Sequence, residues 1–175
     1  MKHSLIALMI VSFACLAQAQ DKDASNGPVK TAPNAEKSGV PNPDARAHEG
    51  VWKPIAAVLG GVRLPEDAVK AITLKITDGN YEVTIEGEKK PDKGICTLDT
   101  TKTPKRMTIK GTDGPNRGKT FLAIYEMKDA VSMRVCYDLS GKEFPKEFKA
   151  PKGTPLYLVG YRRQPEPPAE TATPK

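Results

Sequence analysis

The sequence predicts an all-β protein, folded as a single eight-stranded antiparallel up-and-down barrel with one short helical turn after the first strand. Two observations predict this fold class. Apolar and polar side chains alternate in about eight short segments between residues 50 and 163, as in strands with one face on a core and one in water. Most of these segments are separated by short turns, which join neighbouring antiparallel strands. Closure into a barrel is expected because it removes exposed sheet edges.

The two ends of the chain differ in composition from this body. Residues 1–19 combine a basic start, an apolar run and an Ala-Gln-Ala site, the layout of a secretory signal peptide. The apolar run is shorter than the roughly 20 residues that a transmembrane helix needs. Residues 20–46 and 164–175 are rich in proline and polar residues, so we expect a disordered spacer and a disordered Pro-rich tail around a barrel domain at 47–163. Export to the periplasm or the extracellular space follows.

A lipoprotein signal is the alternative to simple cleavage. Cys15 follows Ala14 near the end of the apolar run, where a bacterial lipoprotein would be cut and lipidated. Ser12 stands where that motif usually has leucine, and the Ala-Gln-Ala site comes shortly afterwards. Cleavage after Ala19 is therefore favoured over anchoring through Cys15.

The first half of the body contains three expected strands. A strand over residues 51–58 ends at two glycines. Residues 64–70 follow as a single helical turn, with an early proline and acidic residues in the first turn, and would close one mouth of the barrel. Strands at 72–77 and 81–86 then alternate strictly, joined by a hairpin turn at 78–80.

The second half continues the meander. A loop at 140–153 interrupts it before the last strand, and we expect Phe144 and Phe148 in this loop to cover a barrel end. The remaining strands are expected at 94–98, 106–110, 120–127, 131–137 and 155–163.

The inward-facing side chains of these strands form a candidate ligand-binding interior. They are mostly branched and medium-sized, with few polar groups to orient a ligand. A barrel of this size either fills its interior with side chains or holds one small ligand, and the sequence leaves both outcomes open. The candidate residues are Leu74, Ile76, Tyr81, Val83, Ile85, Met107, Ile109, Met133, Val135 and Tyr137.

The start of the first strand, Gly50-x-Trp52, resembles the opening motif of lipocalin-type, or calycin, barrels. In that group the tryptophan packs beneath a basic side chain from the end of the last strand. Arg162 or Arg163 stands at that place, and stacking of a guanidinium on an indole contributes roughly 0.5 to 2 kcal/mol. The resemblance thus implies a structural role for Gly50, Trp52, Arg162 and Arg163.

A longer resemblance covers most of the body. It is to a lipocalin-like family of small exported domains, greatly expanded in planctomycete bacteria, that has no assigned activity. The chain departs from that pattern at Cys96, where an aromatic residue is usual, and at Phe144, where an arginine is usual. The resemblance implies a lipocalin-like barrel without a known catalytic residue. Its motifs are Gly50-x-Trp52, Gly94-x-x-x-Leu98-Asp99, Gly114-Pro115-Asn116-x-Gly118-Lys119-Thr120, Ile124-Tyr125-Glu126 and Val135-Cys136-Tyr137.

No residue pattern in the sequence indicates catalysis, a cofactor or a metal. The segment 114–120 differs from a phosphate-binding loop, because it has three residues between its glycines instead of four and precedes a strand instead of a helix. His48 is interpreted as a solvated side chain, and the chain offers too few ligands for structural zinc. The acidic residues that could meet in space are interpreted as solvated: Glu82, Glu86, Asp99 and Glu126.

Charge and cysteine content limit the partners. The net charge is +6, which favours solubility first and an anionic partner second, and no concentrated basic and aromatic face indicates nucleic acid. Strand parity places Cys96 and Cys136 on opposite faces of the wall, so two free thiols are expected. A monomer is expected.

These observations predict an exported, non-enzymatic binding domain of unknown specificity, for a small hydrophobic ligand or an envelope component. The alternative is an interaction or scaffold domain with a packed core. It would use the positive outer face around Lys105, Arg106 and Lys110.

Overall fold

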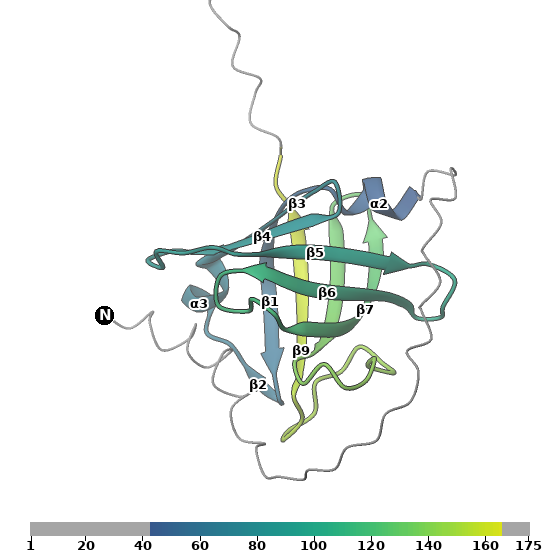
Figure 1. The fold of residues 1–175 in the computed structure, drawn as a ribbon. Helices are drawn as coiled ribbons and strands as arrows, with labels where there is room; N and C mark the ends of the chain where they lie inside the picture. Colours follow the sequence, from purple (N-terminus) through teal and green to yellow (C-terminus); the bar gives the residue numbers. More distant parts are fainter. Residues whose placement is uncertain (1–42, 166–175) are drawn as a thin grey trace, which may run out of the picture.

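The computed structural model describes residues 43–165, which form one antiparallel barrel (Figure 1). The sheet has nine strands in the order β2-β1-β3-β4-β5-β6-β7-β8-β9, and β1 also pairs with β9. This last pairing closes a ring of eight strands, whereas the two-residue β2 pairs with β1 outside the ring. The predicted eight-stranded up-and-down barrel is therefore confirmed.

The strands are close to those expected, and several extend beyond the expected bounds. The helical turn predicted after the first strand is α3 (Glu66–Lys70), which contacts β1 and β3. The strands are β1 (Gly50–Leu59), β2 (Val62–Arg63), β3 (Ile72–Thr77), β4 (Asn80–Ile85), β5 (Asp92–Asp99), β6 (Lys105–Asp113), β7 (Thr120–Asp129), β8 (Ser132–Asp138) and β9 (Leu156–Arg163).

The β3–β4 hairpin shows how the sequence sets the register. Asp78 and Gly79 both have positive φ angles, 50° and 73°, which a tight Asp-Gly hairpin turn requires. The turn pairs Ile76 with Tyr81 and Leu74 with Val83. Because side chains in a strand alternate between its two faces, these four residues all lie on the interior face.

A short helix before the barrel was not expected. Residues 43–46, predicted as the end of a disordered spacer, belong to α2 (Pro43–His48). This prediction was wrong because it was based on the local lack of apolar side chains, whereas α2 is stabilised by contacts with distant strands. The predicted signal peptide (1–19), the lipidation alternative at Cys15, residues 20–42 of the spacer and residues 166–175 of the tail lie outside the described residues.

Most of the loop between β8 and β9 lies on the barrel's outer wall, and we call residues 140–155 the outer strap. Arg106 of β6 stacks on Phe144 at 4.5 Å, and Arg134 of β8 stacks on Phe148 at 4.0 Å. Both arginines point outward, so the expectation that the two phenylalanines cover a barrel end was wrong. Apolar outward-facing residues of this wall, such as Ile124, are buried.

Asp138 holds the start of the outer strap. Its buried carboxylate accepts hydrogen bonds from the Ser140 hydroxyl at 2.6 Å and from the backbone N–H groups of Ser140, Lys142 and Glu143 at 2.8, 3.1 and 2.9 Å. Burial alone would raise the pKa of Asp138, but these donors outweigh it and hold the pKa below its ordinary value.

We expect Asp138→Asn to lower the free energy of unfolding by about 2 kcal/mol near neutral pH, because an amide cannot accept from all these donors as a carboxylate does. The Asp138 contribution is present above the unfolded-state pKa of about 3.9 and is lost as the pH falls through the lower folded-state pKa. Urea unfolding at several pH values should therefore show the wild type and the variant converging in acid. A constant difference down to about pH 2 would contradict this account.

Candidate functional site: the barrel interior

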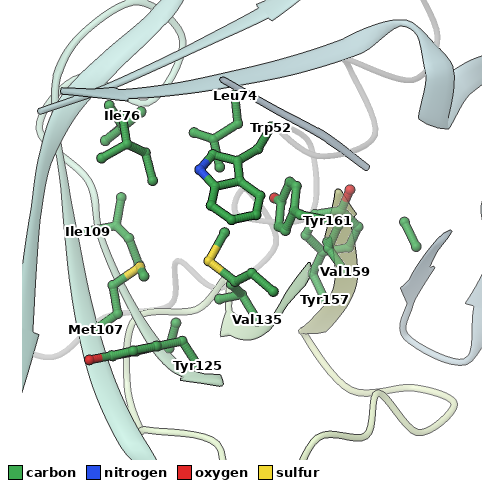
Figure 2. Packing of buried hydrophobic residues seen from close by; sticks show 14 of the residues in the cluster. Trp52, Leu74, Ile76, Met107, Ile109, Tyr125, Val135, Tyr157, Val159 and Tyr161 are labelled. Atoms are coloured by element: carbon green, nitrogen blue, oxygen red, sulfur yellow. The ribbon is translucent and has the colours of Figure 1, made fainter. Parts of the chain in front are cut away.

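The barrel interior contains a cavity of about 160 Å³ that is partly open to solvent, so side chains do not fill the interior completely. All ten residues predicted to form the interior lie on the cavity wall. Figure 2 shows labelled core side chains from β1, β3, β6, β7, β8 and β9 packed toward one another inside the barrel, and those from β3, β6 and β8 also line the cavity. Further wall residues are Ile72, Asp92, Cys96, Pro115, Asn116, Phe121, Leu139, Tyr157 and Tyr161.

One end of the barrel is closed by the Gly50-x-Trp52 motif and Arg163. Trp52 is 0% exposed, and the Arg163 guanidinium lies 4.3 Å from its ring centre. Gly50 has φ 116°, and a Cβ there would lie 2.8 Å from a guanidinium nitrogen of Arg163, so only glycine fits. Arg162 is exposed, which makes Arg163 the stacking partner.

Helix α2 seals this closed end. The Trp52 indole N–H donates to the His48 carbonyl at 2.9 Å, and Arg163 donates to the carbonyls of Ala47, at 2.5 Å, and Glu49. Asp44 accepts from Lys105 at 2.7 Å and from the Tyr125 hydroxyl at 2.8 Å. These contacts come from β1, β6, β7 and β9, so α2 is fixed to four strands.

His48 is buried rather than solvated, contrary to the sequence-based interpretation. It is 2% exposed, and its ring packs edge-on against Tyr125 with the ring centres 4.5 Å apart. The sequence-based interpretation failed because His48 was assigned to the edge of a spacer, and the helix that carries it was missed. Burial lowers the pKa of His48 below its ordinary value.

The opposite end of the cavity has a polar rim. Asp92 at the start of β5 accepts a hydrogen bond from the Tyr81 hydroxyl at 3.1 Å and from the Asn116 backbone and side-chain nitrogens, both at 3.0 Å. Asn116 belongs to the glycine-rich turn after β6, and a Cβ at Gly111 would lie 2.0 Å from its carbonyl oxygen. The turn that superficially matches a phosphate loop therefore packs against the barrel rim, and β7 follows it.

Two tyrosine hydroxyls meet at the cavity wall. The hydroxyl oxygens of Tyr137 and Tyr161 lie 3.1 Å apart, and the Tyr157 ring stacks on Tyr137 with centres 5.9 Å apart. Burial raises the pKa of Tyr137 and of Tyr161 well above the ordinary value, so both hydroxyls keep their protons at neutral pH. Because one hydroxyl donates to the other, the second proton can be donated to an acceptor in the cavity.

The cavity wall carries little charge. Asp92 is the single ionisable acid on the wall, and no lysine or arginine lines the cavity within residues 43–165. Cys96 also lines it, and burial raises the pKa of this thiol to about 12, so it is neutral. Cys136 lies on the outside of the wall, where its thiol donates to the Lys149 carbonyl of the outer strap at 3.4 Å. The two free thiols thus lie on opposite sides, as predicted.

The four acidic residues considered in the sequence have separate surroundings in the described part of the chain. Glu82 pairs with Lys93 at 3.0 Å, and Glu126 pairs with Arg134 at 2.5 Å on the outer wall. Glu86 is exposed, and Asp99 accepts from Thr101 in a turn. Among the described residues, no cluster of three or more His, Cys, Asp or Glu side chains could hold a metal ion.

The positive outer face is partly occupied by contacts within the chain. Lys105 is paired with Asp44, and Arg106 is stacked on Phe144. Lys110 is exposed. Of the three positive side chains proposed to bind a partner in the scaffold alternative, two are therefore already in contact with other residues of the chain.

The polar or aromatic wall residues that were missed in the sequence include Asp92, Asn116, Tyr157 and Tyr161. Tyr157 and Tyr161 share one face of β9 with Val159, but Leu156 and Leu158 on the other face are also apolar, so the period-two signal is weak in the first half of this strand. Asp92 and Asn116 meet only through the packing of the turn, and no local signal identifies them.

Comparison with known proteins does not assign a family to the chain. A scan against protein-family models finds no match, and a search of curated proteins finds no similar sequence. In residues 43–165 there is no helix with the length and apolarity needed to cross a membrane.

Proposed function

We propose that the protein binds one small, uncharged, mainly apolar molecule inside its barrel and performs no reaction on it. The observation that carries this proposal is the cavity of about 160 Å³ with an almost entirely apolar wall. An engineered apolar cavity of about 150 Å³ in another protein binds benzene. The cavity volume therefore fits a ligand with a single ring or a short chain.

The residues of the cavity wall also favour a ligand without charge that carries a hydrogen-bond acceptor. A carboxylate ligand would be buried without a cationic partner and close to Asp92, which is unfavourable. A carbonyl or ether oxygen would instead accept the available proton of the Tyr137–Tyr161 pair. The preferred ligand is thus neutral and carries one hydrogen-bond acceptor.

The expected signal peptide supports the proposal that binding takes place outside the cytoplasm, by a monomer. The closed barrel, the Trp52–Arg163 stack and the motif resemblance support a lipocalin-like relationship. The ligand could be a free small molecule or an envelope component of the same chemistry.

Isothermal titration with three probes of similar size tests the proposal. Acetophenone has a ring and a carbonyl acceptor, ethylbenzene lacks the acceptor, and benzoate carries a negative charge. We expect acetophenone to bind most tightly, ethylbenzene more weakly and benzoate least. Equal binding of benzoate and acetophenone, or no binding of any probe, would refute the proposal.

Tyr161→Phe tests the role of the hydroxyl pair. Without the Tyr161 hydroxyl, the Tyr137 hydroxyl is the single donor left of the pair, and it lies 3.1 Å from the position of the lost oxygen. Because the hydrogen bond to the ligand would have to form from this different position, we expect the acetophenone affinity to fall about tenfold, the value of one hydrogen bond. Ethylbenzene affinity should stay within about threefold, because it makes no hydrogen bond. A parallel loss for both probes would show that Tyr161 acts through packing alone.

A further inference from the structure

A second pocket lies at the closed end of the barrel, between α2 and the β3–β4 turn. Its volume is about 220 Å³. It arises because β4 pairs with β5 only as far as Asn80 and Ile95, whereas β5 continues to Asp99 along β6. Helix α2 covers the resulting gap. The pocket is lined by Ala45, His48, Ile76, Gly79, Cys96, Thr97 and Leu98.

His48 supplies the polar atom that is not used by the fold. Its Nδ1 lies 2.8 Å from the Asp44 carbonyl oxygen. A carbonyl can only accept, so Nδ1 carries the proton and Nε2 of the neutral ring presents a lone pair. Nε2 is buried and has no hydrogen-bond partner among residues 43–165. A buried acceptor without a donor is unfavourable, because it has lost its hydrogen bond to water.

The surroundings of His48 decide what can bind there. Burial lowers the pKa of His48, the hydrogen bond to the Asp44 carbonyl and the charge of Asp44 oppose this lowering, and the charges of Lys105 and Arg163 add to it. The ring is held in place by Tyr125 and by the Asp44 carbonyl, so Nε2 cannot turn outward without breaking both contacts. The rest of the pocket is mainly apolar, with Ile76, Cys96 and Leu98 on the barrel side.

We propose that this pocket is a second binding site, which takes a small neutral molecule that donates an O–H or N–H group to Nε2 of His48. The apolar part of that molecule packs against Ile76, Cys96 and Leu98. Phenols, small alcohols and primary amides have this chemistry. The site is distinct from the barrel cavity and does not depend on its occupant, although Ile76 and Cys96 contribute to both walls.

The test uses the full chain, labelled with ¹⁵N at histidine, and follows the ring nitrogens by NMR. Phenol is the probe, and anisole is the matched control, since it has nearly the same shape without a donor. Phenol should shift the His48 Nε2 signal along a saturating curve in the direction of an accepted hydrogen bond. Anisole at the same concentration should leave Nε2 in place. No phenol shift, or an equal anisole shift, would overturn the proposal.

A variant separates this pocket from the barrel cavity. Ala45 is exposed on α2 and lines only the second pocket, so Ala45→Met should narrow it without disturbing the barrel. We expect the phenol affinity measured at Nε2 to fall at least tenfold. Arg46→Met, on the same helix but not on the pocket wall, should retain the wild-type affinity. Unchanged phenol binding in Ala45→Met would overturn the proposal. If this variant does not fold, the comparison of phenol with anisole in the wild-type protein still tests the proposal.

Discussion

Trp52→Ala should lower the free energy of unfolding by about 4 kcal/mol, the largest stability loss that we expect from any single substitution in the barrel. Trp52 is 0% exposed and packs in the core, so its removal leaves a large cavity at the closed end. The substitution also removes the indole N–H that donates to the His48 carbonyl and the ring on which Arg163 stacks. Urea unfolding followed by circular dichroism measures the loss.

Two control variants make the result specific. Trp52→Phe keeps an aromatic ring but loses the N–H donor, so it should cost less than Trp52→Ala, about 1–2 kcal/mol. Ile55→Ala lies on the same strand, but Ile55 is 62% exposed, and its loss should stay within about 0.5 kcal/mol. A Trp52→Ala loss below about 1 kcal/mol would mean that the closed end does not stabilise the barrel.

The barrel wall could be predicted from the sequence because each strand carries its own signal. Leu74 and Ile76 alternate with polar residues over a few positions, and the Asp-Gly turn that follows sets the register of β4. This inference does not require knowledge of contacts between residues that are far apart in the sequence. The same local pattern placed ten residues of the cavity wall.

Helix α2 could not be predicted because its stability is not local. It has six residues and begins at a proline, and its acidic side chain at Asp44 is held by Lys105 and Tyr125, 61 and 81 residues away. A helix this short is unstable by itself in water. His48 was misinterpreted for the same reason, because its burial depends on α2 lying against the barrel.

The outer strap shows a different limit. Phe144 and Phe148 are apolar, which indicates that they pack against the barrel, but hydrophobicity does not distinguish the end of a barrel from its outer wall. Their partners Arg106 and Arg134 occupy outward-facing positions that look simply solvated in the sequence. The polar rim is similar, because Asp92 and Asn116 are 24 residues apart and meet only when the turn folds back.

Val83→Phe should abolish binding of ring-sized ligands in the barrel, with a loss of affinity of more than about 100-fold. Val83 lies on the cavity wall at mid-strand in β4, opposite Leu74 of β3 and Asp92 of β5. The added ring would occupy a large part of a 160 Å³ space, so a ligand with its own ring would no longer fit. Titration with acetophenone measures the effect directly.

The stability of Val83→Phe distinguishes cavity filling from misfolding. Overpacking a filled core usually costs about 1–3 kcal/mol, whereas filling an existing cavity costs little. We therefore expect an unfolding free energy within about 1 kcal/mol of the wild type together with the lost binding. Ile95→Phe is the matched control, because Ile95 is on the neighbouring strand and 45% exposed, and it should leave binding intact. Retained acetophenone affinity in a stable Val83→Phe variant would place the ligand outside the barrel, because a ring at position 83 and a ring-sized guest cannot share this space.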